Sequence, residues 1–199
     1  MDERAFIARF VRKSDRVAHP GAYPAPVYPT TWERFGQVLQ TVGGRFTGPL
    51  GGAALQAAIA QVVAGAQGRI VASASAAPLL TGTKGWSLAP SGGEKPHDLA
   101  DVDLGILTAE IAVAENAALL LSANSLPERG LAFLAQHLLV LVPAGVLLSD
   151  LITAQTRLPN PPPHHLTWMS GPSKTADIEQ TLVIGAHGAR SLTVIAHQP

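Results

Sequence analysis

The chain has 199 residues, of which 47% are hydrophobic and 14% charged, and its 14 basic and 14 acidic side chains leave no net charge. This composition excludes a disordered chain, and the lack of a basic excess argues against a nucleic-acid partner. The chain contains no cysteine, so it can supply neither a disulfide nor thiolate ligands for an iron–sulfur cluster.

Residues 1–30 are predicted to form an N-terminal appendage, and residues 31–199 the main domain. Apolar side chains at helical spacing predict a helix over residues 2–16: Phe6, Ile7, Phe10 and Val11. Residues 19–29 are rich in proline, which fixes φ and lacks an N–H, so they form an irregular connector. The helix is either an arm that docks on the body or on a second subunit, or a surface helix of the same domain.

Two helices are predicted next along the chain. Thr31 is a suitable N-cap for the first, which Gly43 and Gly44 end. An alanine-rich helix over residues 53–64 precedes a short apolar strand over residues 69–73, which is half of a βαβ unit. The first strand of that unit is signalled only weakly, by Arg45 and Phe46.

The remaining apolar segments are short. They predict strands at residues 104–107, 111–113, 117–121, 137–142, 166–169 and 192–196, a helix or loop at 129–134, and a helix over 147–157. Short strands that alternate with helices favour a layered α/β domain with a largely parallel sheet. No apolar run reaches the roughly 20 residues that span a bilayer, and residues 1–4 lack the apolar core of a signal peptide. A cytoplasmic protein is therefore expected.

The densest cluster of reactive side chains precedes the last predicted strand. Hydroxyl groups beside free backbone N–H groups suit an anion, and glycines let an imidazole approach a ligand as a general base. The candidate ligand-binding residues are Gly171, Ser173, Lys174, Thr175, Gly185 and Gly188, and the candidate catalytic residues are Asp177, Glu179 and His187.

Structural roles account for the same residues. Ser173 and Thr175 can cap one helical turn that Asp177 holds, and His187 can be a hydrogen-bonding turn residue. Ser173, Thr175, Asp177 and Glu179 also alternate at period two, so an extended strand would place all four on one side. A loop with one helical turn is the expected conformation.

Acidic residues are concentrated between residues 98 and 128. Glu110 and Glu115 each follow an apolar run, so they are further ligand-binding candidates that would point from strand ends into a cleft. The other acidic residues, Glu128 among them, are expected to form a solvated rim. No metal site is predicted, because the pair His164-His165 fits no metal-ligand spacing.

Two tracts resemble a known family. The run Ser170-Gly171-Pro172-Ser173-Lys174-Thr175-Ala176-Asp177-Ile178-Glu179, then Val183-Ile184-Gly185-Ala186-His187-Gly188, is similar to the C-terminal signature of the LUD-domain family, in particular its lactate utilisation protein C group. The tract Gly105 to Glu115 resembles paired segments of that family that end in an Ala-Glu step. Asn116-Ala117-Ala118 stands where the family usually has Thr-Gly-Thr or Thr-Gly-Ser, and His187-Gly188-Ala189 stands where it has His-Gly-Pro.

The resemblance implies an α/β fold of the NagB/RpiA/CoA-transferase class, with ligands bound at loops beyond strand ends. It also implies that this chain is one subunit of a system that oxidises L-lactate to pyruvate with iron–sulfur proteins. Because the chain lacks cysteine, the clusters would belong to those partners. The loop would then bind a small anion, a carboxylate or a phosphate. Two alternatives stay open: a stand-alone enzyme that acts on a phosphorylated or CoA-linked small molecule, and a regulatory module without chemistry.

Overall fold

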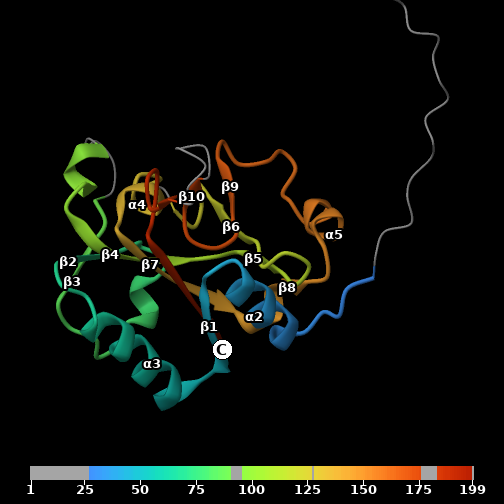
Figure 1. The fold of residues 1–199 in the computed structure, drawn as a ribbon, viewed down its shortest axis with the longest axis horizontal. Coiled ribbons are helices and arrows are strands. Elements are labelled where there is room, and N and C mark those ends of the chain that lie inside the picture. The colour runs from blue at the N-terminus through green and yellow to red at the C-terminus, as the bar shows by residue number, and fades with distance from the viewer. Residues whose placement is uncertain (1–26, 91–95, 127, 176–182, 199) are drawn as a thin grey trace, which may run out of the picture.

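The structure is a computed structural model that describes residues 27–90, 96–126, 128–175 and 183–198. These residues form a six-stranded sheet, a four-stranded sheet and a two-stranded hairpin, with helices on the outside (Figure 1). The helix predicted over residues 2–16 lies outside the described residues, and the division at residue 30 stays a prediction.

The six-stranded sheet is parallel throughout and forms the centre of the domain. Its strand order is β1 (Arg45–Leu50), β12 (Ser191–His197), β7 (His137–Pro143), β4 (Val102–Thr108), β2 (Arg69–Ala72) and β3 (Trp86–Leu88). Every neighbouring pair in this order is parallel. The predicted layered α/β fold with a largely parallel sheet is therefore confirmed.

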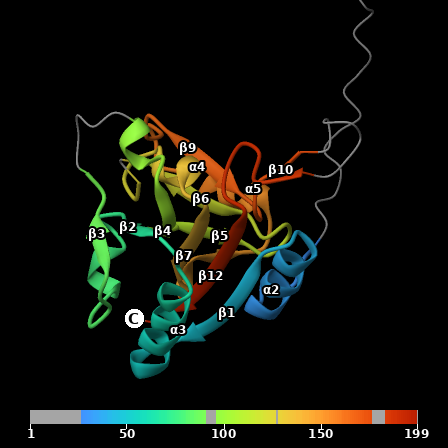
Figure 2. The same cartoon turned by 60° about the vertical axis from the view of Figure 1, so that its left-hand side comes forward.

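Two helices cover opposite faces of this sheet (Figure 2). In α2 (Trp32–Thr41), Thr31 acts as the predicted N-cap and accepts a hydrogen bond from Arg34 N at 3.2 Å. Phe35 and Leu39 of α2 pack into the core cluster on one face, whereas Leu55 and Ile59 of α3 (Gly52–Ala64) pack into the cluster on the other.

A second sheet lies against the α2 face, with the order β8 (Leu147–Leu148), β5 (Ile111–Val113), β6 (Leu119–Ser122) and β9 (Leu166–Met169). Ala154 of α5 (Leu151–Thr156) packs against its outer side. The single helix predicted over residues 147–157 is wrong in its first part, because Leu147 and Leu148 pair with β5 and Asp150 caps the helix only afterwards. A helix of four residues, α4 (Leu131–Leu134), precedes β7.

The remaining described elements are short. A hairpin pairs β10 (Lys174–Thr175) with β11 (Val183–Ile184), and 3₁₀ turns span Ala77–Leu79, Pro96–Leu99 and Ala144–Val146. No helix within the described ranges is long and apolar enough to cross a membrane.

Glu128, just before α4, is not part of a solvated rim, and that prediction is wrong. Both of its carboxylate oxygens are buried, and neither accepts a hydrogen bond from another residue in the part of the chain that the structure describes. Burial raises the pKa of the Glu128 carboxyl above its ordinary value of 4.5, because desolvation disfavours the charged form. The folded chain therefore holds this proton more tightly than the unfolded chain does.

Shortening a side chain at the centre of the sheet should destabilise the domain strongly. Leu139 on β7 is fully buried, so Leu139→Ala is expected to lower the free energy of unfolding by about 2–5 kcal/mol. Gln40→Ala on the exposed side of α2 is the control, with an expected change within about 0.5 kcal/mol. Urea denaturation followed by circular dichroism measures both, and equal midpoints for the two variants would contradict this packing.

Glu128→Gln should stabilise the domain at neutral pH but not in acid. A carboxyl whose folded pKa is raised contributes stability below its unfolded pKa and loses it as the pH rises through its folded pKa. The variant should therefore unfold at a higher urea concentration than the parent at pH 7, and this difference should disappear well below pH 4.5. A difference that is constant across this range would show that folding does not raise the pKa of Glu128.

Candidate functional site

The loop that carries the predicted site starts directly after β9. Gly171 has φ +83°, and a Cβ atom there would lie 2.9 Å from both Cγ2 and the carbonyl oxygen of Val42. Only glycine combines this positive φ with such a close approach. The loop is thereby held against the end of α2.

Ser173 connects the two halves of the loop through its backbone. Its N–H donates to Ala189 O at 2.9 Å, and its carbonyl accepts from Gly185 N at 2.9 Å. The chain continues into β10 in an extended conformation. The helical turn expected after Ser173 and Thr175 would fall on residues 176–182, which lie outside the described residues, so it stays a prediction. Asp177 and Glu179 lie outside the described residues, and their catalytic roles stay predictions.

Ser173 and His187 line the same hollow, which has a volume of about 180 Å³. Gly188 allows their segments to approach, because a Cβ atom there would lie 3.1 Å from Ser173 Cβ. Most of the wall is apolar and comes from α4, β7 and β9: Ala132, Phe133, Leu138, Trp168 and Met169. A hydroxyl and the exposed imidazole of His187 thus border a mainly apolar hollow, an arrangement that suits a small molecule with one polar end.

The other described residues of the predicted loop lie around this hollow. Gly171 and Gly188 line it, whereas Lys174, Thr175 and Gly185 do not. The Lys174 side chain is exposed and lies over the turn after α2, with Nζ 3.2 Å from the position of a Cβ atom on Gly43. The lysine charge is therefore directed at the outer side of the loop.

Glu110 and Glu115 flank β5 of the second sheet, and neither lines the hollow beside Ser173. Glu110 Oε1 accepts a short hydrogen bond from Ser122 Oγ. Glu115 Oε2 accepts from Leu151 N at 3.0 Å and supports the start of α5. Both carboxylates thus make contacts within the fold, and the ligand-binding role predicted for them is a separate, untested hypothesis.

Asp150 supports the same helix end. Hydrogen bonds from Ser149 Oγ, Thr153 N and Thr153 Oγ1 lower the pKa of its carboxyl, because they stabilise the charged form.

The segment that departs from the family pattern still forms a turn. Ala117 takes the φ value of +55°, which costs a non-glycine residue roughly 1 kcal/mol. Asn116 Oδ1 accepts from Ala118 N at 3.1 Å, and Asn116 O accepts from Ser170 Oγ at 2.6 Å. Side-chain contacts therefore hold this turn without a glycine.

Among the residues that the structure describes, no group of three or more His, Cys, Asp or Glu side chains could hold a metal ion. A larger hollow, of about 460 Å³, opens beneath α3 on the opposite face of the central sheet. It contains none of the predicted site residues, so the sequence analysis missed it. The signal available for it was the alternation of polar and apolar residues in Ser191-Leu192-Thr193-Val194.

Comparison with known proteins identifies the family. Residues 80–196 match the LUD domain family. Lactate utilization protein C 1 of Bacillus mycoides is 30% identical over 114 residues, which make up 53% of this chain and 47% of that protein. Lactate utilization protein C of Bacillus velezensis is 30% identical over 110 residues, or 52% and 46% of the two chains. The chain thus spans about half the length of the curated relatives it matches.

A solved structure agrees at the level of the fold. The crystal structure of a DUF162 family protein from Deinococcus radiodurans superimposes with a TM-score of 0.60 at 21% identity, over 83% of this chain and 94% of that chain. The sequence match covers more than half of the residues and confirms the resemblance seen in the C-terminal tract. The chain belongs to the LUD domain family.

Proposed function

We propose that this chain is a cytoplasmic subunit, without a redox centre of its own, of a system that oxidises L-lactate to pyruvate with iron–sulfur proteins. Membership of the LUD domain family supports the proposal, as do relatives at about 30% identity that are named lactate utilization protein C. The observation that carries it is the hollow that Ser173 and His187 line together.

The proposed ligand of this hollow is a small hydroxy-carboxylate. Its carboxylate would accept a hydrogen bond from Ser173 Oγ, and the imidazole of His187 would hold or move the proton of its hydroxyl group. The apolar side chains of Phe133, Trp168 and Met169 would cover a methyl group. L-Lactate has these three parts on adjacent carbons. Asp177 and Glu179 are proposed to orient the imidazole or the ligand.

The redox step is assigned to partner proteins. Lactate oxidation needs an electron acceptor, and a chain without cysteine cannot hold an iron–sulfur cluster through thiolates. In this proposal the present subunit binds and orients the substrate, and the electrons pass to clusters on the partners.

Removing the hydroxyl and the imidazole together should abolish most lactate oxidation. For Ser173→Ala combined with His187→Ala, lactate-dependent dye reduction by the chain with its iron–sulfur partners is expected to fall about a hundredfold or more. The reason is that a positioned acid–base group typically contributes roughly a hundredfold to ten-thousandfold.

The matched control is Ser87→Ala combined with His164→Ala, since both residues are exposed and line neither hollow. Co-purification of the partners with each variant separates lost chemistry from lost assembly. An undiminished rate in the Ser173/His187 variant would rule out the loop as the site of lactate binding.

A further inference from the structure

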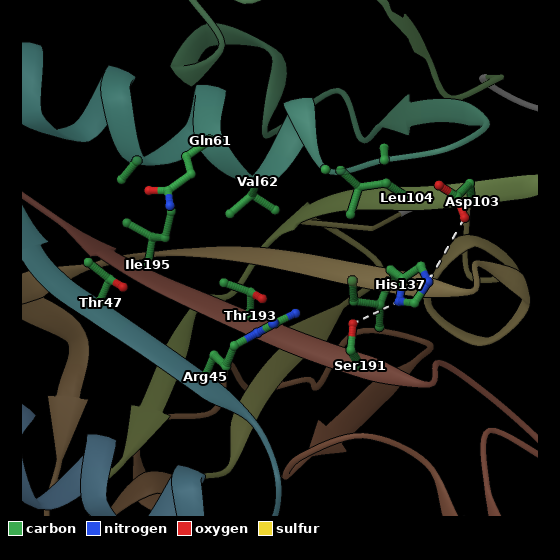
Figure 3. Close-up of a pocket in the computed structure, with 14 residues that line it drawn as sticks. Arg45, Thr47, Gln61, Val62, Asp103, Leu104, His137, Ser191, Thr193 and Ile195 are labelled. Atoms are coloured by element: carbon green, nitrogen blue, oxygen red, sulfur yellow. Dashed lines mark hydrogen bonds and ion pairs between the residues drawn. The ribbon is translucent and has the colours of Figure 1, made fainter.

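One end of the central sheet carries polar side chains where a parallel sheet is normally apolar. Parallel sheets are covered on both faces, so their strands usually carry apolar residues on each side. Here α3 contributes its buried contacts through Leu55 and Ile59, and a hollow of about 460 Å³ lies beneath its second half (Figure 3). The polar side chains that line it come from the starts of four neighbouring strands and from α3: Arg45, Thr47, Gln61, Asp103, His137, Ser191 and Thr193.

The strand register brings these side chains into one row. Arg45 on β1 is opposite Thr193 on β12, and Ser191 on β12 is opposite His137 on β7. Neighbouring strands lie about 4.8 Å apart, so these side chains are close across the sheet. In Figure 3 the Arg45 side chain extends over Thr193 towards Ser191 and His137.

Arg45 carries the one guanidinium among the lining side chains of this hollow and lies at its exposed edge. It makes no hydrogen bond or ion pair with any other residue in the described part of the chain. A guanidinium donates paired hydrogen bonds in a fixed fork, which matches the oxygens of a carboxylate or a phosphate. Thr193 beneath it is only 8% exposed, whereas Arg45 itself is exposed, so an anion could reach the guanidinium from solvent and rest against the buried threonine.

His137 is held between a hydroxyl and an acid. Its Nδ1 lies 2.8 Å from Ser191 Oγ, and its Nε2 lies 4.0 Å from Asp103 Oδ1. The second distance is longer than a direct hydrogen bond, so Nε2 has capacity for a ligand atom.

The other carboxylate oxygen of Asp103, Oδ2, already accepts two hydrogen bonds. A β-bulge, at which Val102 and Leu104 pair with the consecutive residues Arg69 and Ile70, gives β4 one extra residue at this point. Asp103 Oδ2 accepts from the N–H groups of Gln67 and Gly68 at 2.6 and 3.1 Å. Its negative charge is therefore directed at the turn after α3 and at His137, while the Arg45 end of the hollow stays positive.

We propose that this hollow is a second binding site, which takes a small metabolite with an oxyanion at Arg45 and a hydroxyl group at the His137–Ser191 pair. The oxyanion is a carboxylate or a phosphate, since the guanidinium fork recognises the chemistry that both share. The site is independent of the ligand proposed for the Ser173 hollow, because Ser191 and Thr193 face α3 and Leu192 and Val194 face the opposite core.

The test is a titration of the full chain followed in its two-dimensional amide NMR spectrum. Three probes separate the sources of the oxyanion: L-lactate, inorganic phosphate and glycerol 3-phosphate. At least one probe should shift the amide signals of residues 45–47 and 191–193, and glycerol 3-phosphate should bind more tightly than inorganic phosphate because it also carries hydroxyl groups. Absence of such shifts at millimolar probe concentrations would overturn the proposal.

Variants then assign the binding to side chains. Arg45→Ala should weaken the probe about tenfold or more, and Arg45→Lys should give an intermediate loss because an ammonium keeps the charge without the fork. Arg157→Ala is the matched control, since Arg157 is exposed and lines neither hollow. Thr193→Val keeps the side-chain shape and should also weaken binding.

The outcomes separate this site from the one proposed for lactate. If Arg45→Ala and Arg157→Ala bind the probe equally well, the second site is wrong. If the shifts are confined to residues 171–175 and 183–189 and disappear in Ser173→Ala, the second site is also wrong, although the loop site stands.

Discussion

The parallel insertion of β12 between β1 and β7 is the constraint on which the rest of the structure depends. It joins the last described strand to the first and places β12 inside the sheet, next to the edge strand β1 (Figure 2). Side chains of β12 alternate between two cores, with Leu192 and Val194 on the α2 side and Ile195 on the α3 side. Loss of this strand would therefore remove apolar contacts from both layers at once.

The position of β12 also explains why residues that are close together in the sequence line two different hollows. Residues 187–189 lead into the strand and line one hollow together with Ser173, while Ser191 and Thr193 line the other from the opposite face. A stiff strand that is hydrogen-bonded on both sides is a rigid support for side chains that must keep a fixed geometry. Small changes in β12 are thus expected to affect both sites, whereas changes in the loop affect one.

The sequence patterns correctly predicted those helices and strands that depend on interactions between residues close together in the chain. Thr31 caps α2, the helix over residues 53–64 forms, and the apolar run from His137 is a buried strand. The strand at Arg45 was signalled weakly because Gly48 and Pro49 interrupt its pattern, and pairing with β12 across the chain stabilises it. Leu147 and Leu148 likewise form a strand rather than part of a helix, because they pair with β5 from an earlier part of the chain. The polar row beneath α3 was missed because Arg45, His137 and Ser191 are far apart in sequence and meet only through strand order.

The most direct test of the account is a crystal structure of the chain grown with glycerol 3-phosphate and L-lactate. We expect electron density for an oxyanion between the Arg45 guanidinium and the His137–Ser191 pair, with a hydroxy-carboxylate beside Ser173 and His187. Ordered ligand found only outside both hollows, or an Arg45 side chain directed away from Thr193 into solvent, would contradict it.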